Sequence, residues 1–339
     1  MPAPKLNELS LPVETLSLVT VGPGMGESII VVVPPNHVLV VDSLLHRGSC
    51  PTLEFLESKG LEVSVVVLTH PHKDHAEGFD LLIHACKGPV GCGKFFLEGQ
   101  SLADPQQSHL AGKTVQALAA VKSRWESNPT TEWKLETGSR IGLGDSVLTA
   151  LHPDPSEVGN LKRANDWSTP ILLEWKSTRL LLGAEVPKRF WADIDVTFQT
   201  ARHHGYKVAH HCSKSNFEPS VFQGATDRFW VATPCAQKPQ PPRFEDGRGV
   251  DQLLGCVSEV YLTSVLFEVP DRESGAVGRN WLHELASALK TKSSFGGVTL
   301  IPQIEPREPQ DAFVLASWDE NGNLTQLARG EQSVVVVQG

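Results

Sequence analysis

Short apolar runs alternate with polar, glycine-rich or proline-rich stretches along most of the chain. Runs at 15–21, 28–33 and 37–41 are separated by glycine and proline turns, which predicts three strands in an antiparallel meander. The run at 63–68 is β-branched and too short for a typical helix, so we expect a buried strand there. Further strands are predicted at 94–97, 146–151, 171–175, 179–182, 206–209, 229–233, 260–263, 311–318 and 324–327, the last two joined as a hairpin at Asn321-Gly322.

Helical patterns fall between these strands. The pattern predicts helices at 52–59, 76–85, 108–125 and 187–200. In the weakly patterned stretch 272–294, it predicts one helix, at 281–289. The alternation of strands and helices favours an α/β architecture.

Composition narrows the class of protein. The 339 residues are 40% hydrophobic, enough for a packed core, and we expect one large domain over 1–339. The apolar runs are too short to cross a membrane and no export signal is evident, so we expect a cytoplasmic protein with no membrane association.

The six cysteines form no C-x-x-C pair, which indicates neither a disulfide framework nor a thiolate zinc site. A net charge of −9 argues against a broad nucleic-acid-binding face.

Directly after the run at 63–68 comes Thr69-His70-Pro71-His72-Lys73-Asp74-His75. His70 and His72 alternate by two and can point to the same side of an extended backbone, where they can share one ion. Asp74 and His75 follow at the turn into a helix and would project differently, so the motif predicts two adjacent ions. Imidazoles with carboxylates favour zinc, with manganese or iron as the alternatives. The competing interpretation, a solvated turn, explains a single histidine better than this cluster.

The four residues His70, His72, Asp74 and His75 are too few to complete the coordination of two metal ions. His152, Glu185 and His210 each follow an apolar strand, as His70 does, and are the candidates for the remaining ligands. His152 could instead be a surface residue before Pro153, and Glu185 a solvent-facing acid. The adjacent pair His203 and His204 precedes Gly205 and is expected to lie outside the metal site.

The order of these motifs resembles the metallo-β-lactamase superfamily, and more narrowly the soluble domain of competence-type DNA-internalisation proteins and their stand-alone relatives. The similarity rests on His70 to His75, a glycine motif at 21–28, Asp42 after an apolar strand, Asn165-Asp166-Trp167-Ser168, and 207–215. It implies an αββα sandwich, two mixed sheets flanked by helices, over a core at about 14–265 with a C-terminal extension at 266–339. The resemblance also favours His210 over His211 as the ligand and gives Asp42 a supporting role.

Two positions depart from the family pattern. Ala184-Glu185 stands where Gly-Asp is usual, and Cys212 stands where glycine is usual. Glu185 can still bridge two ions, but its extra methylene changes its reach. If the alignment slips by one residue, Ala184 occupies the ligand position and the second ion site is weakened.

Together these features predict a metallo-hydrolase with two divalent ions, preferably zinc and otherwise manganese. Paired ions lower the pKa of a water molecule and polarise the bond that is attacked. Asp74 and His75 are the predicted catalytic residues, and Ser213, Lys214 and Ser215 are expected to hold a phosphate. We therefore expect a phosphodiesterase or nuclease acting on nucleic acid or a nucleotide. Hydrolysis of a small lactone, thioester or β-lactam is the alternative, and a non-catalytic metal-binding scaffold is a second one. The sequence leaves a protein partner or a homo-oligomer open.

Overall fold

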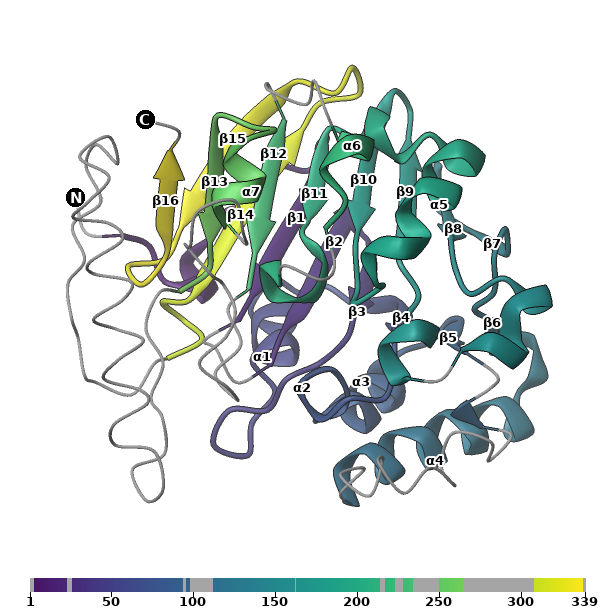
Figure 1. Cartoon of the computed structure of the whole chain (residues 1–339). Helices are drawn as coiled ribbons and strands as arrows, with labels where there is room; N and C mark the ends of the chain where they lie inside the picture. The colour runs from purple at the N-terminus through teal and green to yellow at the C-terminus, as the bar shows by residue number, and fades with distance from the viewer. Residues whose placement is uncertain are drawn as a thin grey trace, which may run out of the picture.

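Two eight-stranded mixed sheets form the centre of the molecule (Figure 1). The computed structural model describes residues 3–22, 26–93, 96–97, 112–161, 163–213, 217–222, 228–233, 250–264 and 308–337. The first sheet has the order β15-β14-β1-β2-β3-β4-β5-β6 and the second β16-β13-β12-β11-β10-β9-β8-β7. Within them, β3 to β6 and β10 to β13 pair in parallel, and the other neighbours pair antiparallel.

The strands of the first sheet come from both ends of the chain. They are β1 (Leu16–Val21), β2 (Ser28–Val33), β3 (His37–Val41), β4 (Val63–Leu68), β5 (Val90–Cys92), β6 (Glu132–Lys134), β14 (Phe313–Trp318) and β15 (Leu324–Arg329). The second sheet contains β7 (Arg140–Leu143), β8 (Ser146–Ala150), β9 (Ile171–Trp175), β10 (Thr178–Leu182), β11 (Gly205–Lys207), β12 (Phe229–Ala232), β13 (Glu259–Leu262) and β16 (Val334–Val337). The C-terminal strands thus belong to both sheets.

Helices cover the outer face of each sheet. The helices are α1 (Pro51–Ser58), α2 (Lys73–Ala76), α3 (Phe79–Ala85), α4 (Gly112–Ser127), α5 (Trp191–Phe198), α6 (Pro219–Phe222) and α7 (Val250–Leu254). Apolar residues of α1, α3 and α4 pack on the first sheet, and residues of α5, α6 and α7 pack on the second. A third apolar cluster fills the space between the sheets. The predicted αββα sandwich is confirmed.

Successive side chains of a strand point to opposite faces of its sheet, and both faces are buried, which explains why the strand runs are apolar throughout. In β10, Leu180 and Leu182 face the opposite sheet, whereas Leu181 packs under the helices. Each strand is therefore covered on both faces, and burying one such side chain contributes about 1.5–3 kcal/mol. Among the described residues, no helix combines the length and apolar character needed to cross a bilayer.

Most strand predictions are confirmed within two residues, and the meander of β1, β2 and β3 is antiparallel as expected. The short strands β5, β6, β7 and β16 were not predicted. A strand at 94–97 was expected, but Phe96 and Leu97 are not in one and residues 94–95 lie outside the described residues. Residues 108–111 of the expected helix at 108–125, and the expected helix at 281–289, also lie outside them.

Two expected helices are divided or end differently from the prediction. The helix expected at 76–85 is instead α2 followed by α3, because Gly78 turns the chain at φ +90°. The helix expected at 187–200 is a 3₁₀ turn, Lys188–Phe190, followed by α5. α5 ends at Gln199, whose φ of +52° ends the α-helical repeat.

Replacing Gln199 with glycine is predicted to stabilise the fold. The side chain of Gln199 is exposed, and its left-handed backbone costs a non-glycine residue about 1 kcal/mol. We expect Gln199→Gly to raise the melting temperature by about 2 °C. The matched control Ala192→Gly, at an exposed position inside α5, should lower the stability by about 0.5–1 kcal/mol. Calorimetry measures both, and a destabilised Gln199→Gly variant would contradict this account of the helix end.

Candidate metal centre

The candidate ligands come from loops that follow strands at one edge of the sandwich. β4 leads into His70 and His72, and α2 then carries Asp74 and His75. β10 leads into Glu185, and β11 leads into His210 and His211. Because the two sheets face each other, these loops from different sheets converge. Their side chains form two groups whose ligand atoms lie close together: Asp74, His75, Glu185 and His211, and His70, His72 and Glu185.

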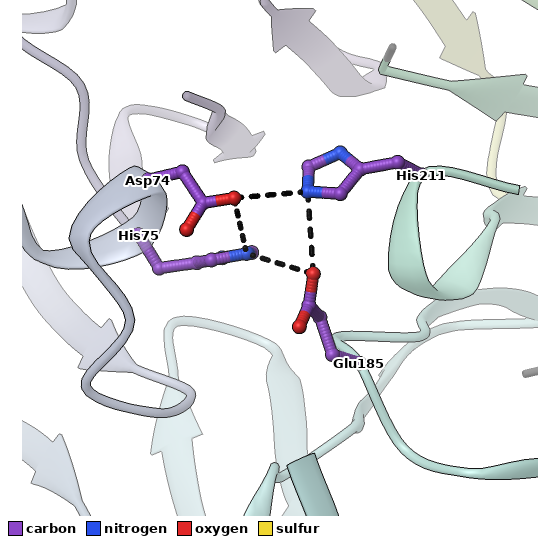
Figure 2. A group of neighbouring side chains, drawn as sticks. All are labelled: Asp74, His75, Glu185 and His211. Carbon is purple, nitrogen blue, oxygen red and sulfur yellow. Dashed lines mark ion pairs between the residues drawn. The ribbon is translucent and has the colours of Figure 1, made fainter. Parts of the chain in front are cut away.

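The Glu185 carboxylate belongs to both groups. Its Oε2 lies 3.1 Å from His70 Nε2 and 3.4 Å from His72 Nδ1. Its Oε1 lies 3.4 Å from His75 Nε2 and 3.2 Å from His211 Nε2, as Figure 2 shows for the second group. Glu185 is only 2% exposed. The longer side chain therefore reaches between both sets of imidazoles, and Glu185 rather than Ala184 places the carboxylate there.

Outer partners fix the orientation of the buried imidazoles. His75 Nδ1 donates to Asp42 Oδ2 at 2.7 Å, and His211 Nδ1 donates to the Thr233 carbonyl at 2.9 Å. Thr69 Oγ1 donates to Asp42 Oδ2 at 2.7 Å, so its oxygen can accept from His70 Nδ1 at 3.1 Å. With Nδ1 occupied in this way, each ring directs its Nε2 toward Glu185. This arrangement is typical of histidines that ligate metals.

Asp42 therefore has the supporting position that the family resemblance implies. It is fully buried, and it accepts both the Thr69 N–H (2.8 Å) and the hydroxyl of the same residue. Burial raises the pKa of Asp42, while His75 acts in the opposite direction. Its φ is +58°, a conformation that aspartate tolerates better than most residues. One carboxylate thus links the His70 and His75 sides of the site.

The electrostatics of the cluster favour ionised carboxylates. Burial alone would raise the pKa of Glu185, but His210 and the hydrogen-bonding contacts with His211 and His70 hold it well below its usual value. Burial would likewise raise the pKa of Asp74, and His75 and His211 lower it below the usual range. Burial lowers the pKa of His70 to about 3, which keeps that ring neutral. A neutral ring is the form that ligates a metal.

A buried ion pair behind the site was not predicted. Lys207 Nζ donates to Glu27 Oε2, which also accepts from the Thr233 hydroxyl. Glu27 Oε2 lies 3.5 Å from His211 Nδ1. Burial would raise the pKa of Glu27, but Lys207, His75 and His211 lower it to about 2. The two ends of the pair are 180 residues apart, so spacing alone could not join them. The position of Glu27 at the end of the glycine motif was the available signal.

The two adjacent histidines after β11 have different environments. His211 is 2% exposed, and its Nε2 lies 3.3 Å from Asp74 Oδ2. His210 is half-buried, and its Nε2 lies 3.7 Å from Glu185 Oε1. The structure thus brings His211, rather than the expected His210, into the compact group. Three consecutive residues, ending at Cys212, have φ between +48° and +63°, and this left-handed turn directs His211 inward.

Two other expected ligand or support residues lie near this edge. His152 is buried, but its Nε2 donates to the Asp166 carbonyl at 2.7 Å, and it is in neither of the two groups. Nδ1 is therefore the atom of His152 left for a metal. Ser168 Oγ accepts the N–H of Glu185 at 2.8 Å, which gives the Asn-x-x-Ser motif a structural role.

The remaining predicted residues are placed only in part. Ser213 is half-buried and its N–H donates to the His210 carbonyl at 2.8 Å, whereas Lys214 and Ser215 lie outside the described residues. His203 and His204 precede β11, at the strand end away from the cluster. Their expected exclusion from the site agrees with this placement.

The geometry of the donor atoms fits cations. His70 Nε2 and His72 Nδ1 lie 2.9 Å apart, too close for two lone pairs that share neither a proton nor a cation. His75 is fully buried, and its Nε2 lies 3.4 Å from Glu185 Oε1. Four imidazoles around two carboxylates match the ligand chemistry of zinc.

Comparison with known proteins agrees with this chemistry. Residues 21–158 match the family model described as the metallo-beta-lactamase superfamily. The chain is therefore similar to the metallo-β-lactamase superfamily over that stretch. Its αββα sandwich is the fold expected for that superfamily, whose domains bind divalent metal ions.

Individual relatives are distant. The hydroxyacylglutathione hydrolase of Methylobacillus flagellatus is 38% identical over 55 residues, which cover 16% of this chain and 21% of that protein. The chain therefore spans about a fifth of the length of this curated relative. CmlA, a diiron β-hydroxylase from Streptomyces venezuelae, matches with a TM-score of 0.38 and 18% identity, covering 59% of this chain and 35% of that chain. The metallo-β-lactamase SMB-1 matches with a TM-score of 0.37 and 15% identity, covering 56% and 76%.

The inward position of His211 predicts which histidine matters for metal content. We expect His211→Ala to lose about one of two zinc ions per chain, because its Nε2 faces both Asp74 and Glu185. His210→Ala is the matched control and should keep both ions. Elemental analysis of zinc-loaded proteins measures this, with circular dichroism to verify folding. The reverse order of effects would assign the ligand to His210.

Proposed function

We propose that the protein is a metal-dependent phosphodiesterase that acts on nucleic acid or a nucleotide. The observation that carries this proposal is the Glu185 carboxylate, which has His70 and His72 beside one oxygen and His75 and His211 beside the other. We assign His70, His72 and His152 to a first ion, and Asp74, His75 and His211 to a second, with Glu185 between them. Zinc is the preferred metal, and manganese the alternative.

The reaction that we propose is hydrolysis. Two ions bound here would activate a water molecule and polarise the phosphorus–oxygen bond. Asp74 is half-buried and ionised, so its carboxylate can accept a hydrogen bond from the attacking water and orient it. Asp42 and Thr233 would keep the His75 and His211 rings in place during turnover, because they hold the outer nitrogens of those rings.

Cations beside the cluster support a phosphodiester substrate. Arg189 is exposed and lies 4.5 Å over the Phe190 ring, which in turn packs 4.4 Å from His152. Its guanidinium also pairs with Asp166 Oδ1 at 2.6 Å, which holds it beside the His152 loop. Lys73 is exposed between two of the proposed ligands. The order of residues from Lys207 to Ser215 resembles competence-type domains, and it adds Lys214 as a third cation from sequence alone.

The hydroxyacylglutathione hydrolase match supports a second candidate function. The shared stretch is short, but the relative's name indicates a small substrate rather than a nucleic acid. The same two ions could hydrolyse a thioester or a lactone, because the metal site does not determine the leaving group. The second candidate is therefore a hydrolase of such small molecules.

An activity panel separates these functions. Zinc- or manganese-loaded protein is offered single-stranded DNA, duplex DNA, RNA, bis-p-nitrophenyl phosphate, a hydroxyacylglutathione and a lactone. We expect phosphodiester cleavage, and we expect Arg189→Gln to raise its KM about tenfold with little change in kcat. The control Lys122→Gln removes the same charge from the exposed side of α4 and should behave as the wild type.

Each other result has a definite meaning. Turnover of the thioester or lactone alone, with Arg189→Gln unchanged, would contradict the phosphodiesterase proposal and support the second candidate. Failure to cleave any substrate by protein that holds two ions would support a metal-binding scaffold instead.

A further inference from the structure

A second polar pocket lies at the end of the sandwich opposite the metal centre. Its volume is about 570 Å³, within the range of small-molecule sites. Its lining includes residues at the start of β11, β12 and β13, and others from the β14–β15 hairpin (Figure 1). β12 begins at Phe229, which lines this pocket. Thr233, which directly follows β12, contacts His211. About 13 Å of strand therefore separates the pocket from the cluster.

Two guanidinium groups line this pocket. Arg228 is half-buried and Arg202 is exposed, and neither forms an ion pair within the part of the chain that the structure describes. Burial lowers the pKa of Arg228, although a guanidinium remains charged under all ordinary conditions. Glu259 is the one carboxylate in the lining, and it accepts a hydrogen bond from Tyr261. A half-buried cation without a counter-ion is costly, and a bound anion would offset that cost.

A histidine in the lining is oriented as a further donor. His204 Nδ1 accepts the N–H of Arg179 at 3.0 Å, and burial lowers the pKa of this ring. The neutral ring therefore carries its proton on Nε2, on the side of Gly322 in the hairpin turn. His203, in contrast, is occupied on both nitrogens, by the Thr200 carbonyl and the Trp230 indole. Donors thus predominate over acceptors in this pocket.

Apart from Ser258 and Gly322, the rest of the lining is apolar. The rings of Phe229 and Trp318 meet edge to face with centroids 5.6 Å apart. Leu324 of β15 is 47% exposed, unusually high for a large apolar side chain in this protein. An apolar wall beside two cations is the composition of a site for an organic anion rather than for an inorganic ion alone.

We propose that this pocket binds a small organic anion, whose carboxylate, sulfonate or phosphate pairs with Arg202 and Arg228 and whose apolar body packs on Phe229 and Leu324. Arginine suits this role because its planar guanidinium pairs with such groups through two parallel hydrogen bonds. The pocket is separate from the metal centre. Its ligand is therefore a molecule other than the substrate that is hydrolysed at the metals.

Calorimetric titration of the metal-loaded protein tests this proposal. The probes are 2-naphthoate, its uncharged isostere 2-naphthamide, and inorganic phosphate. We expect naphthoate to bind more tightly than either of the others. Arg228→Gln should weaken naphthoate about tenfold, for one lost charge-assisted contact, and should remove the preference over naphthamide. Arg202→Gln, at an exposed position that tolerates substitution, should act in the same direction.

The control is Arg140→Gln, which removes an exposed guanidinium that lies outside this pocket and should leave naphthoate affinity unchanged. Equal affinity for naphthoate in wild type, Arg228→Gln and Arg202→Gln would overturn the proposal, because the anion would then bind elsewhere, including at the metals. Equal affinity for naphthoate and naphthamide would overturn the role of charge, and equal affinity for phosphate would overturn the role of the apolar wall.

Discussion

The fully enclosed Glu185 carboxylate is the interaction on which the site depends. An ionised carboxylate that is removed from water costs several kcal/mol unless positive charge or hydrogen bonds replace the water. Here four imidazole nitrogens surround its two oxygens, and they come from loops of both sheets. The sandwich therefore brings together groups that would be unstable in isolation. Cations bound between these nitrogens and oxygens would balance the carboxylate charge directly.

The surroundings of Glu185 show how the fold maintains this arrangement. Asp42, Thr233 and Glu27 of the Lys207–Glu27 pair lie on the far side of the His75 and His211 imidazoles, so that these two rings have little freedom to turn. Strained backbone accumulates in the same place: Asp42, Ala184 and the turn at His210 all have positive φ. Such residues cost about 1–3 kcal/mol each and persist only where neighbours determine their conformation. Ala184 and Cys212 also keep left-handed backbone although neither is glycine.

The local parts of this structure could be predicted from the sequence, and the contacts between distant segments could not. Apolar runs located β1 to β4 and β8 to β10 because each strand is buried on both faces. Strands of three or four residues, such as β5 and β6, have too few positions to show a period. The His70 to His75 motif is local and was recognisable, whereas the choice between His210 and His211 depends on left-handed turns that adjacent identical residues cannot reveal. Glu27 was missed because its partner Lys207 comes from the other sheet.

The central claim is that Glu185 lies between two metal ions, and anomalous diffraction from crystals of the zinc-loaded protein tests it most directly. The account predicts two zinc peaks about 3.5–4 Å apart, one beside Glu185 Oε2 with His70 and His72, the other beside Oε1 with His75 and His211. A single peak, or a second peak that does not contact Glu185, would contradict it.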